Sequence, residues 1–201
     1  MKKGLSVQAV MLALAALTGV VHANSIIPTL SSITPAGSNF SYSYDVILTN
    51  QEKLDTAQNS AFYTIYDFHG LVPGSESQPA GWSASEQNTG ITPTLTAPID
   101  DPGVTNITWT YIDSTVINGT GGSLGTFSAL SSIGPGTQLT MFTAQATKDT
   151  PRDPSSNNTV TQNVGSIETP ASVVPEPASL TLFGLGGGLL GLAFLRRRLA
   201  R

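Results

Sequence analysis

The stretch "FSYSYDVILTN", residues 40–50, alternates large apolar side chains with mostly small or polar ones. Because successive side chains of a β-strand point to opposite faces of its sheet, this period of two predicts a strand with one buried and one solvated face. The predicted buried face consists of Phe40, Tyr42, Tyr44, Val46 and Leu48. Asn50 ends the pattern, since asparagine is depleted in strands.

Similar stretches recur along the chain and indicate its fold class. Each is rich in Thr, Val, Ile or aromatic residues and is bounded by Gly, Pro, Asn or Ser. These features predict strands at 60–68, 106–117, 123–130, 137–147 and 159–167. Helical periodicity is absent from this part of the chain. Short strands with frequent turns and few charges predict one all-β domain, an antiparallel β-sandwich with an Ig-like outline.

Turn-forming residues indicate how the strands are connected. Asn118-Gly119 is typical of a primed turn, and it predicts a hairpin between the strand that contains Trp109 and the next one. Residues 98–103 and 131–136 are rich in Pro, Gly and Ser or Asp and are predicted to be loops.

The N-terminal segment has the three parts of a secretory signal. Lys2 and Lys3 precede an apolar run at 10–21, and Ala23 follows at the position that signal peptidase reads. The sequence therefore predicts a signal peptide at 1–23, cleaved after Ala23.

The C-terminal segment predicts a single membrane crossing. Residues 178–195 are uncharged and, at roughly 27 Å as a helix, match the hydrocarbon thickness of a bilayer. A basic tail at 196–201 follows, and clustered arginines beside a span are expected to stay in the cytoplasm. The arginines next to the span are Arg196, Arg197 and Arg198. The domain at 24–168 is then exported, and a linker at 169–177 joins it to the transmembrane helix.

The exported part is acidic and lacks cysteine. Residues 24–175 contain three basic and twelve acidic residues, a net charge of −9. Nucleic acid is not expected as a partner, because such binding depends on Lys and Arg that neutralise phosphates. Without cysteine there are no disulfides and no thiolate metal ligands, and we expect neither a metal nor a cofactor.

The tail combines Pro175-Glu176-Pro177, the apolar span and the arginine cluster in that order. This order resembles the PEP-CTERM sorting signal of Gram-negative bacteria that make extracellular polysaccharide. The resemblance implies cleavage near the Pro-Glu-Pro motif by an exosortase-type membrane protease, and display or release of the domain outside the cell. The two prolines also favour an extended segment that a protease can reach. A plain membrane anchor with a proline-stiffened linker stays open as the alternative.

Four segments of the body resemble a recurrent domain type of proteins with this tail. The segments are "YDVILTN" at 44–50, "FYTIYDFHG" at 62–70, "PAGW" at 79–82 and "DDPGVTNITWTY" at 100–111. The resemblance implies a structural or surface role and no particular activity.

One short stretch matches the sequence motif of a catalytic serine. Ser123 lies in a G-x-S-x-G pattern, which in α/β-hydrolases requires a strand-to-helix turn and a histidine later in the chain. No helix is predicted here, and His69 precedes the serine. A triad of His69, Ser123 and either Asp100 or Asp113, in another order, stays open as a serine hydrolase alternative.

Other residues suggest binding chemistry. Asp67 and His69 would share one face of the strand predicted at 60–68, as a metal pair does, and Asp100-Asp101 could offer calcium two carboxylates. A solvated strand face and an ordinary turn explain these residues as well. Trp82, in a predicted loop, is the candidate for stacking on a sugar, with burial over the sandwich edge as the alternative.

A glycine-rich pattern within the predicted span also has two interpretations. Residues 186–191 fit G-x-G-x-x-G, but a dinucleotide site requires a preceding strand in a βαβ unit. Within a membrane span, the glycines would instead allow close contact with another helix, for which the processing enzyme is a candidate.

The sequence thus predicts a non-enzymatic exported protein of the cell surface or the extracellular polysaccharide matrix. Its expected partners are signal peptidase, an exosortase, the membrane and polysaccharide. A carbohydrate-binding module that uses Trp82 and a hydrolase that uses Ser123 are the alternatives.

Overall fold

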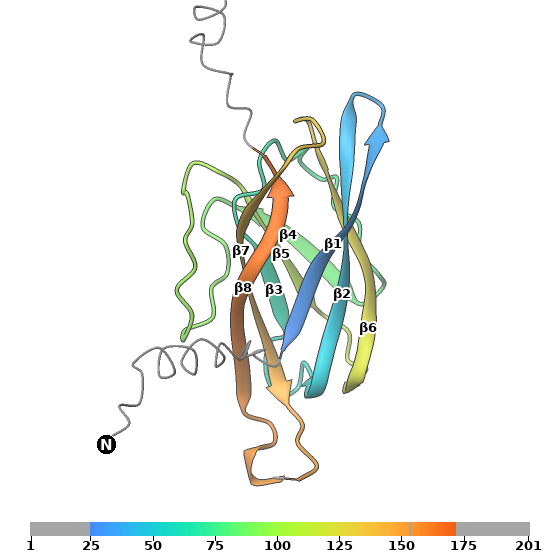
Figure 1. Ribbon diagram of the computed structural model, residues 1–201. Coiled ribbons are helices and arrows are strands. Elements are labelled where there is room, and N and C mark those ends of the chain that lie inside the picture. Colours follow the sequence, from blue (N-terminus) through green and yellow to red (C-terminus); the bar gives the residue numbers. More distant parts are fainter. Residues whose placement is uncertain (1–24, 153, 172–201) are drawn as a thin grey trace, which may run out of the picture.

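The computed structural model describes residues 25–152 and 154–171 (Figure 1). The predicted signal peptide with Ala23, the Pro-Glu-Pro motif, the transmembrane helix and the arginine cluster lie outside these residues.

The described chain forms eight strands and one short 3-10 helix. They are β1 (Ile26–Ala36), β2 (Asn39–Leu54), β3 (Phe62–Ile65), β4 (Trp82–Gln87), β5 (Asn106–Tyr111), β6 (Ile117–Ser131), β7 (Thr137–Lys148), η1 (Pro154–Ser156) and β8 (Val160–Pro170). All pairings between the strands are antiparallel.

The strands form one sheet that curls into two layers. Its path is β1-β2-β7-β3-β5-β4, with β6 added to β2 and β8 added to β7. β2 pairs with β1 and β6 along most of its length, but with β7 only at Glu52 and Lys53. Beyond this short junction, β1, β2 and β6 face the layer of β8, β7, β3, β5 and β4 (Figure 1). The predicted all-β antiparallel fold is confirmed, and its Ig-like outline stays a prediction.

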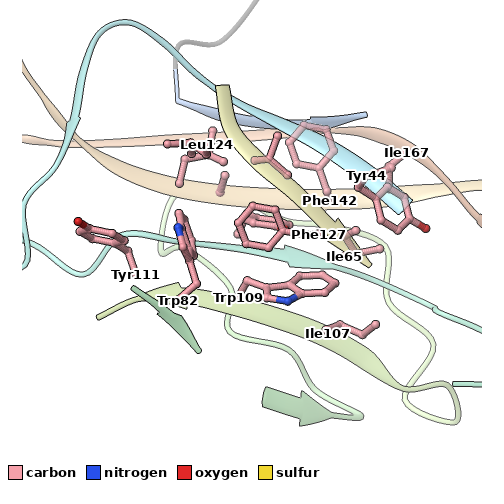
Figure 2. Close-up of a cluster of buried hydrophobic side chains, with 14 of the residues drawn as sticks. Tyr44, Ile65, Trp82, Ile107, Trp109, Tyr111, Leu124, Phe127, Phe142 and Ile167 are labelled. Atoms are coloured by element: carbon pink, nitrogen blue, oxygen red, sulfur yellow. The ribbon is translucent and has the colours of Figure 1, made fainter. Parts of the chain in front are cut away.

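The core lies between the two layers and is rich in aromatic rings (Figure 2). The ring of Phe127, from β6, meets the rings of Tyr63, Trp82 and Trp109 edge-on, at centroid distances of 5.4, 5.1 and 5.9 Å. These three partners come from β3, β4 and β5, so Phe127 links the layers. Such edge-to-face contacts add to the hydrophobic stabilisation of the burial itself.

The opening stretch of the sequence forms β2 as its alternation predicts, but β2 continues past Asn50, the predicted end, to Leu54. The side chains of Tyr42, Tyr44, Val46 and Leu48 are at most 1% exposed, and all face the core from β2. Phe40 is only partly buried but packs against the same cluster. The period of two therefore sets which face of β2 is buried.

Other predicted boundaries need correction. β1 and β4 were not among the predicted strands, whereas β3 is shorter than the predicted 60–68 and β5 ends at Tyr111 rather than at residue 117. β1 and β4 each pair with a single strand, at opposite ends of the path. Edge strands tolerate the prolines of β1 and need fewer strand-forming residues, so both are weakly marked in the sequence.

Asn118-Gly119 is not a hairpin turn, and that prediction is wrong. Both residues lie in β6, where Asn118 pairs with Lys53 of β2. A Cβ on Gly119 would lie 2.0 Å from the carbonyl oxygen of Glu52 and 2.6 Å from that of Thr49. The glycine permits close approach to an irregular part of β2. β5 and β6 do not form the predicted hairpin, because they belong to different layers.

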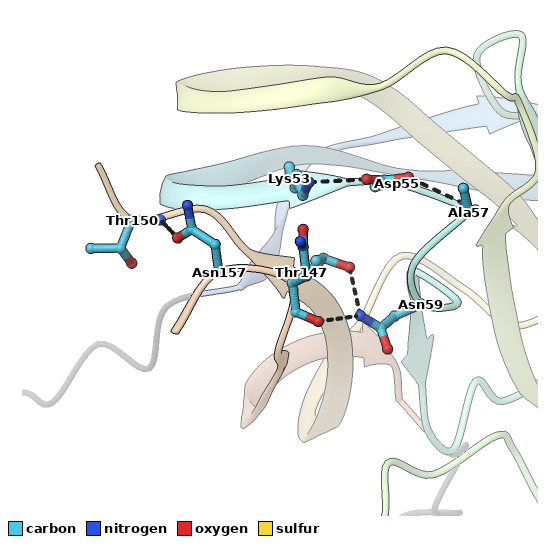
Figure 3. A network of polar contacts seen from close by, with 8 residues as sticks. Lys53, Asp55, Ala57, Asn59, Thr147, Thr150 and Asn157 are labelled. Atoms are coloured by element: carbon cyan, nitrogen blue, oxygen red, sulfur yellow. Dashed lines mark hydrogen bonds and ion pairs between the residues drawn. The ribbon is translucent and has the colours of Figure 1, made fainter. Parts of the chain in front are cut away.

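A polar network closes the end of the domain where β2 and β7 finish (Figure 3). It includes the pairs Lys53 Nζ to Asp55 Oδ2 (3.0 Å), Asn59 Nδ2 to Thr147 Oγ1 (3.2 Å) and Thr150 N to Asn157 Oδ1 (2.6 Å). Of the described residues, only Lys53, Lys148 and Arg152 are Lys or Arg, and all three lie at this end. The opposite end of the domain therefore lacks a Lys or Arg in its described part.

Candidate functional site

The chain leaves the domain at the end of β8, directly before the Pro-Glu-Pro motif. Hydrogen bonds hold the last described residues: Ala171 N to Gly136 O (2.9 Å), Thr169 Oγ1 to Asp67 O (3.3 Å) and Tyr44 OH to Glu168 O (3.1 Å). Residues 169–170, assigned to the linker from the sequence, belong to β8. Pro175 follows Ala171 by four residues, which span at most about 14 Å in any conformation.

A buried tyrosine fixes the loop beside this exit. The hydroxyl of Tyr42 lies 2.9 Å from the carbonyl oxygens of both Gly134 and Gly136, in the loop between β6 and β7. Burial raises the pKa of Tyr42, which keeps its hydroxyl protonated as a donor. Gly136 O also accepts the amide of Ala171. The core therefore determines where the chain leaves the domain.

An acidic group lies at the same end. Asp67 Oδ1 accepts the amide of Asp101 (2.9 Å), while Asn106 accepts the amide of Asp67 (2.8 Å) and donates to Asp100 Oδ1 (2.8 Å). Burial raises the pKa of Asp67, and the charges of Asp100 and Asp101 raise it further. These contacts order the 98–103 loop.

The metal hypotheses gain no support from this geometry. Among residues 25–152 and 154–171, no three His, Cys, Asp or Glu side chains are grouped to hold a metal ion. Asp67 has a φ of +56° and lies beyond the end of β3, so it does not share a strand face with His69 as predicted. The carboxylates of Asp67, Asp100 and Asp101 instead accept hydrogen bonds from the chain itself.

Trp82 does not lie in a loop, and it is buried. It begins β4, is 6% exposed and packs edge-on against the rings of Tyr63, Tyr111 and Phe127 (Figure 2). A ring that stacks on a sugar needs a free face, and this one is covered by aromatic neighbours. The residue belongs to the core, as the alternative interpretation held.

Ser123 is not near His69, the histidine of its proposed triad. It lies within β6, and its hydroxyl accepts the amide of Gly125 at 3.1 Å. His69 lies beside Ser131, whose hydroxyl donates to the His69 carbonyl at 2.8 Å. Eight residues of strand separate Ser123 from Ser131, roughly 25 Å. The strand-to-helix turn of a nucleophile elbow does not occur at Ser123 either.

Two glutamates, the buried Glu52 and the half-buried Glu76, were not singled out from the sequence. Burial raises the pKa of Glu52 in β2 to about 7. It also raises that of Glu76 to about 7, with a further increase from the hydrogen bond and charge of Glu86. Glu76 lies in the connection between β3 and β4, whereas Glu86 lies in β4. Only the folded chain buries Glu52 and brings Glu76 against Glu86, so no local sequence pattern marks these residues.

The comparison with known families identifies the tail. A family model described as the PEP-CTERM protein-sorting motif matches residues 173–198. The chain carries this sorting signal, which implies an exported protein whose membrane-anchored precursor is processed by an exosortase, a membrane protease. No curated protein and no solved structure matches the chain. In the described part of the chain, no helix has the length and hydropathy of a membrane span.

Proposed function

We propose that this chain, which carries the PEP-CTERM sorting signal, is a non-enzymatic protein of the cell surface or the extracellular polysaccharide matrix. A signal peptide at 1–23 starts its export, and a transmembrane helix at 178–195 holds the precursor in the membrane. An exosortase then cuts near Pro175-Glu176-Pro177 and frees the β domain for display or release. The observation that carries the proposal is the match of the sorting-motif model to residues 173–198, directly beyond the last strand.

The surface of the domain suits a hydrated polysaccharide layer. The exported part carries a net charge of −9, and such a charge limits self-association. The exposed side of β1 consists largely of small hydroxyl residues: Thr29, Ser31, Ser32 and Thr34. Hydroxyl groups can exchange hydrogen bonds with sugars and water alike. Association with polysaccharide would therefore use a broad polar surface rather than an aromatic platform at Trp82.

The proposed absence of enzymatic activity is supported by two placements. His69 contacts β6 at Ser131, eight residues along the strand from Ser123. The Asp67 carboxylate is occupied by a hydrogen bond from the chain itself. A serine-directed fluorophosphonate should leave the purified protein unlabelled. Labelling that is lost in Ser123→Ala would contradict this part of the proposal.

Replacement of the Pro-Glu-Pro motif tests the sorting mechanism. With Pro175, Glu176 and Pro177 changed to alanine, we expect uncut precursor to accumulate in the membrane of the producing bacterium. Ser172→Ala serves as the control, because it changes the residue directly before the matched segment 173–198 and leaves the sorting signal intact. Product of normal size in the motif variant would contradict processing at this site.

A separate experiment tests the association with polysaccharide. The native extracellular product should migrate more slowly in a gel that contains the producer's own polysaccharide than in the same gel without it. Equal mobility in both gels would contradict the matrix role and leave export and processing untouched.

A further inference from the structure

An exposed apolar groove lies next to the exit of the chain. Ile99 and Leu139 are 78% and 72% exposed, and they line one groove together with Thr140, Met141 and Ser166. The amide of Ile99 contacts the sulfur of Met141 at 3.0 Å, which places the 98–103 loop against β7. Two large aliphatic side chains of high exposure that share one groove are typical of an interaction surface.

The groove is close to the sorting signal. Leu139 of β7 pairs with Glu168 of β8, which precedes Pro175 by seven residues. Seven residues span at most about 25 Å. Because Leu139 lies about 5 Å from Glu168 as its strand partner, whatever binds the chain at Pro175 must work within about 30 Å of Leu139.

We propose that the groove between Ile99 and Leu139 is a docking surface for the membrane protease that cuts at the sorting signal. This inference rests on the processing proposed above. The fixed exit gives the groove a constant direction relative to the chain that the protease receives, since Ala171 is bound to the loop that Tyr42 holds. The two contacts, groove and motif, then reinforce each other as linked binding sites do.

The charge distribution favours a protein partner over lipid. Attachment to a membrane surface relies on Lys and Arg that are attracted to anionic head groups. The charged residues described around the groove are acidic: Asp67 lines it, Glu168 pairs with Leu139, and Asp100 and Asp101 lie in the same loop as Ile99. Every described Lys or Arg lies at the opposite end of the domain. A small apolar groove with an acidic border instead fits an aliphatic side chain and a basic border on the protease.

Processing kinetics in the producing bacterium test the proposal. In the full-length chain, the double variant Ile99→Ser/Leu139→Ser should be processed about tenfold more slowly than the wild type in a pulse-chase experiment, because two aliphatic contacts are lost. Ile112→Ser is the matched control, since Ile112 is 62% exposed and lies at the opposite end of the domain. It should be processed at the wild-type rate.

The outcomes separate the docking surface from the processing itself. If the double variant and the wild type are processed at equal rates while the Pro-Glu-Pro variant stays uncut, the docking proposal alone is overturned. A wild-type chain that is never cut would overturn both. Slowing by Ile112→Ser to the same extent would also overturn the docking surface, because the effect would then not depend on the groove.

An insertion and a cross-link distinguish docking from obstruction and from lipid binding. Ten Gly/Ser residues inserted between Ala171 and Ser172 should slow the wild type and leave the double variant unchanged, because the two contacts are no longer coupled. Faster processing of the insertion variant would mean that the domain obstructs the protease, and it would overturn the proposal. A photo-reactive residue at exposed Thr137, beside the groove, should capture the protease, and capture of lipid alone would contradict it.

Discussion

The hydroxyl of Tyr42 lies 2.9 Å from the carbonyl oxygen of Gly136, and the same oxygen accepts the amide of Ala171. One buried side chain of β2 thus shares an acceptor with the last described residue of the chain. Four residues later the Pro-Glu-Pro motif begins. The core of the domain therefore fixes the point at which the described chain ends, four residues before the motif.

Removal of the Tyr42 hydroxyl should lower the stability of the domain. Tyr42→Phe leaves the ring in the core but removes the donor to Gly134 and Gly136, and we expect a loss of about 1 kcal/mol in the free energy of unfolding. Urea denaturation of residues 24–175 measures this difference.

Tyr63→Phe is the matched control for that variant. Tyr63 is also fully buried, but its hydroxyl has no hydrogen-bond partner. Its removal should therefore leave the free energy of unfolding unchanged or increase it, because no donor is lost and a buried polar group disappears. A larger loss for Tyr63→Phe than for Tyr42→Phe would contradict the assignment.

Gly119 should not tolerate a side chain, because it lies in β6 against the backbone of β2 and not in a turn. In Gly119→Ala the new Cβ would overlap backbone oxygens of β2, and we expect a loss of about 3 kcal/mol or a change in the pairing of β2 and β6. Gly122→Ala, in the same strand, places its Cβ in open space and should change stability by less than about 0.5 kcal/mol. Equal melting temperatures for the two variants would show that β2 does not approach Gly119 as described.

Stability should decrease as the pH rises from about 4.5 to about 7. The pKa values of Glu52 and Glu76 are near 7 in the folded chain and 4.5 without burial. Between these values the folded state binds more protons than the unfolded state, so each unit increase in pH favours unfolding. The contribution is fully present below about pH 4.5 and is lost above about pH 7.

Two variants test the source of this pH dependence. Glu52→Gln and Glu76→Gln should each reduce the slope of unfolding free energy against pH, measured by urea denaturation, and together they should nearly remove it between pH 5 and pH 7. A slope that is unchanged in the double variant would assign the effect to other groups.

Trp82 should contribute to stability rather than to sugar binding. Trp82→Ala removes a buried ring that touches three aromatic neighbours, and we expect a loss of about 3 to 5 kcal/mol. Trp82→Phe retains most of the packing and should migrate in polysaccharide gels as the wild type does. If a folded Trp82→Phe protein were no longer retarded in these polysaccharide gels, the hypothesis that Trp82 contacts a sugar would be restored.

The sequence predicts the fold class and the central strands because their patterns are local. The alternation at 40–50 corresponds to the buried face of β2, and the predicted strand at 137–147 matches β7 to within one residue. β1 and β4 were missed, because an edge strand needs only half of the pairing partners, which permits Pro28 and Pro35 in β1. Gly119 was misread because its neighbours in space, Thr49 and Glu52, are distant in sequence.

The tail and the domain differ in how much of the site the sequence reveals. The sorting signal is a contiguous pattern, and the family model confirms it at residues 173–198. The bond between Tyr42 and Gly136 joins residues that are 94 positions apart, and the groove at Ile99 and Leu139 combines a loop with a strand. Such relationships depend on the topology of the sheet, which one sequence does not specify.

Mass analysis of the C-terminus of the native extracellular product tests the central claim most directly. The account predicts a product that ends near Pro175-Glu176-Pro177 and lacks the apolar and arginine-rich residues that follow. A product that retains residues through Arg201, or a full-length chain that is found only in the cytoplasm, would contradict it.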